Sequence, residues 1–183
     1  KDKVPDMHVG LNILQSDHIA DLAVAKATEA EFLRAGYYTE AAIVDVGIME
    51  GNGGKTLRYR KALNCNARIF ADVQIKHSYP LARRDLLDSV EYAYDRGLAD
   101  AIIITGEKTG KSADINSVKT IKEARPDIPI ILGSGTTVDN ISDFAPFIDA
   151  VIIGTSLHYD GALQTDLDPD RVEQFMKKVE QLR

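Results

Sequence analysis

Short apolar runs alternate with amphipathic stretches along the whole chain, and this alternation limits the folds open to it. The apolar runs read as strands at residues 7–14, 32–38, 67–77, 100–106, 128–135 and 149–156. Between and after them, apolar residues recur at helical spacing and predict helices at 17–30, 55–63, 82–97, 114–126, 137–146 and 168–183. Strands so regularly separated by helices predict a parallel sheet with right-handed crossovers.

Two architectures fit such a pattern, an open doubly wound sheet and a (βα)8 barrel. An open dinucleotide-binding sheet carries its glycine fingerprint after the first strand, whereas the glycines here cluster after the last two predicted strands. Barrels often hold phosphate in the loops after strands seven and eight. We therefore expect the α/β fold of a (βα)8 barrel. About six units are present and the first two are lacking, so residues 1–183 would form a single domain, the C-terminal three quarters of the barrel.

The composition argues against several classes of protein. A net charge of −6 disfavours broad nucleic-acid binding, which needs a basic surface. A single cysteine, Cys65, excludes an internal disulfide and a cysteine-based zinc site. His8, His18, His77 and His158 form no metal-ligand pair of the H-x-x-x-H kind. No apolar run approaches the roughly 20 residues of a membrane span, and no signal peptide is evident. We expect a cytoplasmic protein without metal or cofactor.

The stretch "GNGGKT" at 51–56 imitates a nucleotide-binding P-loop. A P-loop has the spacing G-x-x-x-x-G-K-[ST], because a long loop of N–H groups must wrap the phosphates. Met49 stands where the first glycine is required. The spacing therefore predicts a loop that leads into a helix, and not an NTPase site.

Two glycine-containing segments follow the last two predicted strands, "LGSGTT" (132–137) and "IIGTSL" (152–157). Glycine lets the backbone approach a ligand closely, and a helix beginning near Thr137 would point its free N–H groups at the loop. We expect phosphate or another anion to bind here, with ligand-binding residues Gly133, Ser134, Gly135, Thr136, Gly154, Thr155 and Ser156. The alternative is two tight turns that need glycine for a positive φ.

The strand within "FADVQIKHS" (70–78) carries polar side chains on the face that a barrel turns inward. Buried charge is costly unless it is paired or functional. Polar groups at inward or strand-end positions are Asn12, Arg34, Asp72, Gln74, Lys76, Thr105 and Ser134. Lys76 near the strand end is expected to act as nucleophile or base, or to neutralise an anionic substrate. The alternative is a structural network in which Asp72 pairs with Arg34 and Lys76 only lines the mouth.

Five segments resemble motifs of one family, the BtpA family. They are "GLNIL" (10–14), "FADVQIKHSYPL" (70–81), "RGLADAIIITGEKTG" (96–110), "ILGSGTTVDNI" (131–141) and "AVIIGTSLHYDG" (150–161). The resemblance runs over nearly the whole chain and implies a TIM-type barrel of the ribulose-phosphate-binding type. It also implies about two β-α units before Lys1. One departure is Gly36, which stands where members commonly have Asn.

Two functions are consistent with these residues and with the resemblance. The first is an enzyme acting on a phosphorylated small molecule, with Lys76 and Asp72 as catalytic residues in lyase, isomerase or aldolase-type chemistry. The second, implied by the family's link to photosystem I accumulation, is a non-catalytic assembly factor for a membrane complex. The expected ligand is a phosphorylated small molecule or free phosphate. The sequence is also compatible with a homo-oligomer.

Overall fold

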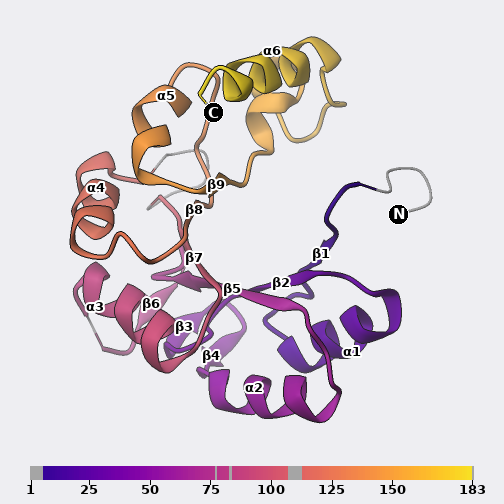
Figure 1. Ribbon diagram of the computed structural model, residues 1–183, viewed down its shortest axis with the longest axis vertical. Coiled ribbons are helices and arrows are strands. Elements are labelled where there is room, and N and C mark those ends of the chain that lie inside the picture. Colours follow the sequence, from indigo (N-terminus) through magenta and orange to yellow (C-terminus); the bar gives the residue numbers. More distant parts are fainter. Residues whose placement is uncertain (1–5, 77, 83, 107–112, 183) are drawn as a thin grey trace. The chain divides into compact units, whose positions relative to one another are not determined.

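The computed structural model describes residues 6–76, 78–82, 84–106 and 113–182. The chain divides into two compact units, Lys1–Ile102 and Ile103–Arg183. Strand β7 (Ala101–Ile104) crosses the boundary between them. Each unit is built from parallel strands and helices that alternate along the chain, as the sequence pattern predicts (Figure 1).

Three parallel strands form the sheet of the first unit, in chain order. β1 (Gly10–Leu11) pairs with β2 (Phe32–Ala35), which pairs with β5 (Arg68–Val73). The helices α1 (His18–Thr28) and α2 (Gly53–Ala62) lie beside each other (Figure 1). Leu22, Leu33 and Ile69 are fully buried in this unit. Burial of such aliphatic side chains supplies most of the stability of a small core.

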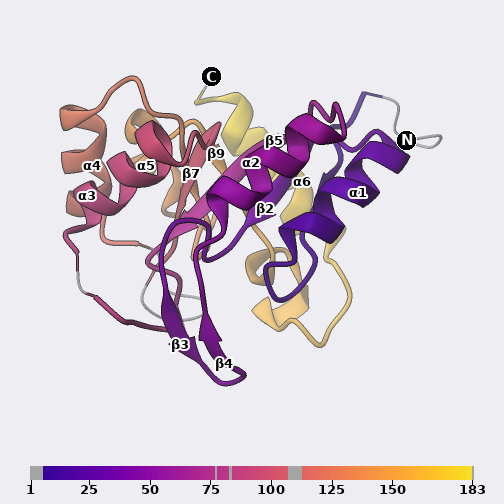
Figure 2. The ribbon, with the colours of Figure 1, turned by 90° about the horizontal axis from the view of Figure 1, so that it is seen from below.

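A small antiparallel sheet accompanies the parallel one, and the sequence pattern did not predict it. β3 (Ala42–Val44) pairs with β4 (Gly47–Met49) in a hairpin and with β6 (Tyr79–Pro80) on its other side. Gly47 closes the hairpin with a φ of 119°, a conformation that favours glycine. Figure 2 shows the hairpin extending away from α1 and α2. The segment "AAIVDVGIM" (41–49), from which β3 and β4 come, shows no regular alternation of apolar and polar residues.

Tyr38 links the segment after β2 to the end of the helical stretch that follows β6. That stretch consists of α3 (Leu86–Glu91) and a π-helical turn over Tyr92–Arg96, and it ends at Gly97 as predicted. The Tyr38 hydroxyl donates to the carbonyl of Gly97 at 2.7 Å. Burial raises the pKa of Tyr38 to about 12, so its phenol stays protonated and keeps donating.

In the second unit, β8 (Ile130–Leu132) pairs in parallel with β9 (Ala150–Val151). The end of β7 lies beside β8, where the Gly133 N–H donates to the Ile104 carbonyl at 2.8 Å. The helices are α4 (Ile115–Ala124), α5 (Ile141–Phe144) and α6 (Pro169–Glu180). The helices predicted at 114–126 and 168–183 begin as expected, since Asp114 and Asp168 cap α4 and α6 and each accepts two N–H bonds from the first turn.

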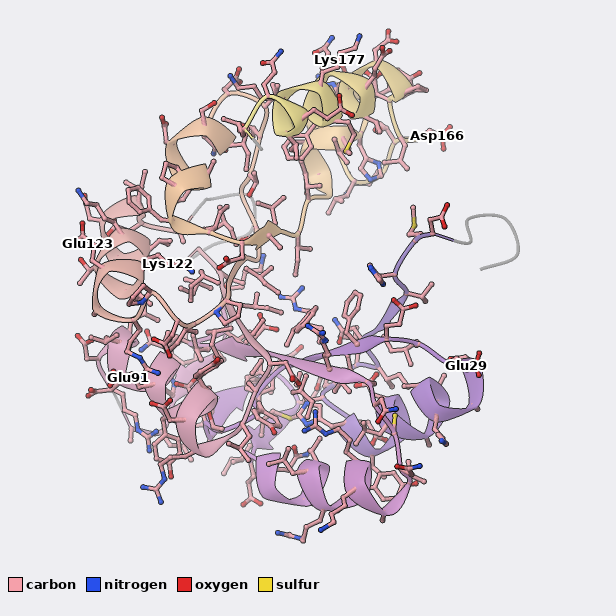
Figure 3. All side chains as sticks on the ribbon, in the orientation of Figure 1. Glu29, Glu91, Lys122, Glu123, Asp166 and Lys177 are labelled. Carbon is pink, nitrogen blue, oxygen red and sulfur yellow. The ribbon has the colours of Figure 1, made fainter. Side chains whose placement is uncertain are left out.

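An aspartate just before a strand holds the neighbouring strand and a helix in both units. Asp100 accepts from the Ile69 N–H at 2.8 Å and from Arg60 at 3.2 Å. Asp149 accepts from the Ile130 N–H at 2.8 Å and from Lys122 at 2.9 Å. Lys122 is labelled on α4 in Figure 3. Each carboxylate thus connects a strand to the helix that precedes it in the chain.

All six predicted parallel strands are present, as β1, β2, β5, β7, β8 and β9, but each is shorter than predicted. The predicted strand 67–77 ends at Val73, and the predicted strand 149–156 covers only Ala150–Val151. The predicted helix 137–146 begins at Ile141, because Thr137–Asn140 close a turn in which the Asn140 side chain accepts from the Thr137 N–H at 2.9 Å. That the whole chain forms one domain stays a prediction.

Candidate functional site

Arg34 of β2 and Asp72 of β5 form a two-pronged ion pair across neighbouring strands. Arg34 Nε donates to Asp72 Oδ2 at 2.7 Å and Arg34 Nη2 to Asp72 Oδ1 at 2.8 Å. The strand register explains the pair, because Arg34 lies opposite Phe70 and Ala35 opposite Ala71, so Asp72 follows directly. The pairing expected from the sequence is therefore confirmed.

Opposing effects act on the Asp72 carboxyl, which is 3% exposed. Burial raises its pKa above the ordinary value, while the hydrogen bonds and charge of Arg34, and more weakly the charge of Lys76, oppose that rise. The hydrogen bonds that Arg34 donates to Asp72 raise the pKa of Arg34 in turn. Arg34 is therefore held as a cation whose Nε and Nη2 atoms are turned toward Asp72.

A pocket of about 310 Å³ opens beside this pair, wholly within the first unit. It is lined by Asn12, Leu14, Gln15, Ser16, Arg34, Gly36, Tyr37, Val44, Asp45, Asp72 and Ile75. Three residues predicted as a group, Asn12, Arg34 and Asp72, thus meet at one cavity. Gly36 is part of its wall, and a Cβ there would lie 2.9 Å from Ser16 Oγ. A side chain in place of Gly36 would therefore compete with Ser16 for the same space.

Sequence reasoning missed Ser16, Tyr37 and Asp45 in this pocket. Tyr37 has a φ of 48°, a left-handed conformation that is uncommon for a tyrosine. Burial raises the pKa of Tyr37; its hydrogen bond with Ser78 opposes that rise, and the charges of Asp45 and Asp72 add to it. The "AGYY" segment (35–38) was predicted as the end of a strand, whereas β2 ends at Ala35, and the family departure at Gly36 was the signal that pointed to this stretch.

Gln74 and Lys76 do not share the face of Asp72 through strand alternation, because β5 ends at Val73. Gln74 has a φ of 47°, and its side-chain amide donates to the Arg84 carbonyl at 3.1 Å and to Ser89 Oγ at 3.3 Å. Strand alternation therefore does not place Gln74 on the inward face with Asp72, and its ligand-binding role stays a prediction. Lys76 is half-buried, and within the described part of the chain it forms no ion pair.

The two glycine-containing segments lie next to each other in the second unit. The Ser156 hydroxyl donates to the Thr136 carbonyl at 2.9 Å and so ties one segment to the other. Gly133 needs to be glycine, because a Cβ would lie 2.6 Å from side-chain carbons of Ile103 and of Thr105. Gly135 has a φ of 75°, as the alternative of a tight turn expects. Around Gly154, by contrast, a Cβ would meet nothing within 4 Å.

Three hydroxyl groups at these segments are buried without a hydrogen-bond partner among the described residues. They belong to Thr105, Ser134 and Thr136. Buried polar groups are nearly always satisfied by protein, water or ligand, so three unsatisfied hydroxyls near one another indicate a place for a polar group. The expected helix dipole is not part of this place, since α5 begins only at Ile141. The hydrogen-bond donors that the segments present to a polar group are therefore these hydroxyls and the N–H groups of the loops.

On the α6 side of the same segments lies a pocket of about 460 Å³ with an acidic lining. Asp139, Asp168 and Asp170 face it together with Arg171. Arg171 pairs with Asp168 at 3.4 Å and donates to the Ser156 carbonyl at 3.3 Å. Three carboxylates against one guanidinium disfavour an anion there. An anion would therefore bind on the side of the buried hydroxyls.

Another pocket, of about 780 Å³, lies at the opposite ends of the strands in the first unit. Its lining includes Phe32 and Arg68, the first residues of β2 and β5, together with Asn64 and Cys65. Active sites of barrels are built at the carboxyl ends of the strands. By that rule the pocket beside Arg34 and Asp72 lies at the strand ends where a barrel active site is expected, and this pocket does not.

The "GNGGKT" stretch proves to be a link between two helices. Only Glu50–Asn52 separate β4 from α2, which is too short a loop to wrap phosphates. The Asn52 side chain bonds His18 Nδ1 at 2.6 Å, and the Thr56 hydroxyl donates to the Asn52 carbonyl at 3.1 Å. Its polar residues thus join the starts of α1 and α2.

Within the described ranges, no group of three or more His, Cys, Asp or Glu side chains is arranged to hold a metal ion. His77 lies outside the described residues. Among the helices of the described part, none combines the length and the apolar character that crossing a bilayer requires.

Comparison with protein families and curated proteins gives a consistent result. The model of the BtpA family matches residues 2–181. An uncharacterized protein of Methanocaldococcus jannaschii is 37% identical over 96% of this chain and 66% of its own length. The photosystem I biogenesis protein BtpA of Synechocystis is 35% identical over 93% of this chain and 60% of its own length. The chain thus spans slightly less than two thirds of the length of these relatives.

Several solved structures share this fold at low sequence identity. KGPDC from Streptococcus mutans has a TM-score of 0.62 at 14% identity, covering 99% of this chain and 76% of its own. Phosphoribosyl anthranilate isomerase from Thermus thermophilus has a TM-score of 0.58 at 11% identity, covering 95% and 72%. Orotidine 5'-monophosphate decarboxylase from M. jannaschii has a TM-score of 0.57 at 13% identity, covering 94% and 74%. The chain therefore has the α/β fold of a TIM-type barrel.

Proposed function

This chain belongs to the BtpA family, and from that premise we propose that it binds the phosphate group of a phosphorylated small molecule at its two glycine-containing segments. The observation that carries the proposal is the group of buried hydroxyls of Thr105, Ser134 and Thr136. Hydroxyl and backbone N–H donors are the usual partners of a phosphate oxygen in barrels of this kind. The names of two solved structures with this fold, the isomerase and the decarboxylase, contain a phosphorylated compound.

The geometry around each glycine supports this ligand. Gly133 packs against the end of β7 and holds the first segment close to the strands, while the Ser156 hydroxyl ties the second segment to it. The space beside Gly154 is open. A phosphate bound at the segments would accept hydrogen bonds from the buried hydroxyls of Thr105, Ser134 and Thr136. These bonds would offset the desolvation cost of burying the hydroxyls.

Inorganic phosphate is the probe for this proposal. It should raise the Tm of the protein with a dependence on concentration that follows mass action. Gly154→Asp should abolish this shift without unfolding the protein, because the new carboxylate enters open space and repels the anion. Gly154→Ala is the matched control, which keeps the space largely free and should keep most of the shift.

A second variant isolates the hydroxyl contribution. Thr136→Val keeps the volume and removes one buried hydroxyl that has no partner among the described residues. We expect about a tenfold weaker phosphate affinity, since a lost hydrogen bond to a charged group costs about 1.5 kcal/mol. An unchanged Tm in phosphate, or equal shifts in Gly154→Asp and Gly154→Ala, would reject the site.

For an enzymatic reaction, Lys76 is the residue we propose to carry the chemistry. Both carboxylate oxygens of Asp72 accept from Arg34, so Asp72 is better suited to hold Arg34 than to accept a proton itself. Lys76 is half-buried and forms no ion pair within the described residues. An amine in this position suits a Schiff base with a carbonyl group or the neutralisation of a substrate anion.

The alternative is a non-catalytic role in assembling a membrane complex. It is favoured by the name of the Synechocystis relative, the photosystem I biogenesis protein BtpA. The two functions differ in what they require of Lys76. An assembly factor should tolerate Lys76→Ala in a complementation assay, whereas an enzyme that uses this amine should not.

A further inference from the structure

The small antiparallel sheet of the first unit turns one apolar face to the solvent. Ile43 of β3 lies opposite Ile48 of β4 on one side and opposite Tyr79 of β6 on the other. Residues directly opposite each other in an antiparallel pair share a face. Ile48, Ile43 and Tyr79 therefore form a row across all three strands, with exposed fractions of 62%, 45% and 77%.

Two more apolar residues extend this row. Val46 in the hairpin turn is 63% exposed, and Leu81, which continues β6, is 55% exposed. We call these five residues the hairpin face. None of them is charged, although charged side chains are the usual protection of a small exposed sheet. The other face of the sheet is different, since Ala42 of β3 is buried.

We propose that the hairpin face is an interface through which two copies of this chain associate face to face. An exposed cluster of large apolar side chains on one sheet face is typical of a protein–protein contact. The row suits a second copy of the chain. A two-fold axis that runs parallel to β3, midway between the two sheets, places Ile43 of one copy against Ile43 of the other. The same axis places Tyr79 of each copy on Ile48 of the other.

This arrangement matches large side chains with smaller ones. A tyrosine facing an isoleucine on both sides of the axis keeps the two sheets at an even separation, close to the 10 Å of packed sheets. Stacking Tyr79 on its own mate would instead leave a gap over Ile48. The row is therefore complementary to itself in only one of the two symmetric arrangements.

The available area limits how strong the dimer is. The five side chains expose roughly 500 Å² of apolar surface per copy, judged from the area typical of such residues. Two copies together reach about 1,000 Å², the lower limit for a specific interface. We therefore expect a weak, reversible dimer whose population rises with protein concentration.

Sedimentation analysis over a concentration series from about 1 to 500 µM tests this interface in the full chain. The expected result is a monomer–dimer equilibrium that Ile48→Lys weakens at least tenfold while the circular dichroism spectrum stays unchanged. Met176→Lys is the matched control. Met176 is a comparably exposed apolar residue on α6, at 49%, and its replacement should leave the equilibrium as it is.

Cross-linking provides a second readout that does not depend on a destabilising charge. A cysteine at position 43 lies on the symmetry axis, so Ile43→Cys should be joined to its mate by a short bis-maleimide. Met176→Cys should not be joined, and the native Cys65 is buried. A monomer at every concentration, or a dimer that responds equally to the changes at 48 and 176, overturns the proposal. A hairpin face that binds another protein without self-association also overturns it.

Discussion

The guanidinium of Arg34 and the carboxylate of Asp72 meet through two hydrogen bonds of 2.7 and 2.8 Å between adjacent parallel strands. Asp72 is buried, whereas Arg34 keeps part of its side chain at the pocket. Such a pair is costly to break, because removal of one partner leaves a buried charge without compensation.

Arg34→Met should therefore lower the free energy of unfolding by about 3 kcal/mol, as measured by urea denaturation at pH 7. Lys177→Met is the control, because Lys177 pairs with Glu173 across one turn of α6 and both side chains are exposed. That exposed pair should contribute only about 0.5 kcal/mol. Equal losses in the two variants would contradict the structural importance of the buried pair.

Asp21 of α1 should make stability depend on pH. Its side chain is fully buried, and one oxygen accepts from the Ile13 N–H at 2.9 Å. Burial raises the pKa of Asp21, while the bond from Ile13 and the charge of His18 oppose that rise and Asp17 adds to it. A folded pKa above the unfolded value means that the native state holds this proton more tightly.

The free energy of unfolding should consequently fall as the pH rises from the unfolded pKa of Asp21, near 3.8, through its raised folded pKa. Asp21→Asn should remove this part of the pH dependence in urea titrations between pH 4 and 7. Its amide oxygen can still accept from the Ile13 N–H. Asp88→Asn, at an exposed position of α3, controls for the loss of one charge. A pH profile identical in Asp21→Asn and Asp88→Asn would reject this role.

Two glycines should respond in opposite ways to alanine. At Gly97 a Cβ would lie 2.4 Å from the Ala93 carbonyl oxygen and 3.0 Å from the Tyr38 ring, so Gly97→Ala should cost about 2 kcal/mol. At Gly54 in α2 the nearest atom is the flexible end of Arg58 at 3.3 Å. Gly54→Ala should stabilise the protein by about 0.5 kcal/mol, since alanine favours helix. Thermal unfolding of both variants measures the difference, and a loss of stability in Gly54→Ala would indicate a role for its glycine.

Lys76 distinguishes covalent chemistry from anion binding. If Lys76 forms a Schiff base, borohydride added with a phosphorylated ketone such as dihydroxyacetone phosphate should trap an adduct on this residue, seen by mass spectrometry. Lys76→Arg should abolish the adduct but keep phosphate-dependent stabilisation, because the charge is retained. Equal labelling of Lys76 and of the exposed Lys177 would speak against a special amine.

Periodicity located the six parallel strands and the caps of α4 and α6, because long alternations and capping residues act locally. Periodicity did not predict where the strands end. Gln74 and Lys76 continue the alternation of β5 in the sequence, yet the strand stops at Val73, where Gln74 turns to a positive φ. This turn depends on bonds from Gln74 to Arg84 and Ser89, which lie far along the chain. No local pattern encodes such contacts.

The candidate site, too, could be predicted from the sequence only in part. Arg34 and Asp72 were predictable as partners, because strand order and register follow from the alternation of strands and helices. The walls of their pocket were not, since Tyr37 and Asp45 come from a loop and a hairpin whose conformations depend on glycine and on short-range bonds. The ligand-binding roles of the predicted residues, including the two glycine-containing segments, remain predictions.

The aspartates before β7 and β9 also influence how the sheet is put together. The segments "DAIIITG" (100–106) and "DAVIIGT" (149–155) begin with Asp100 and Asp149, which bind the N–H groups of Ile69 and Ile130. A strand that slipped by one residue would present its other face and leave the carboxylate without its N–H donor. Each aspartate therefore favours a single register between its own strand and the neighbouring one.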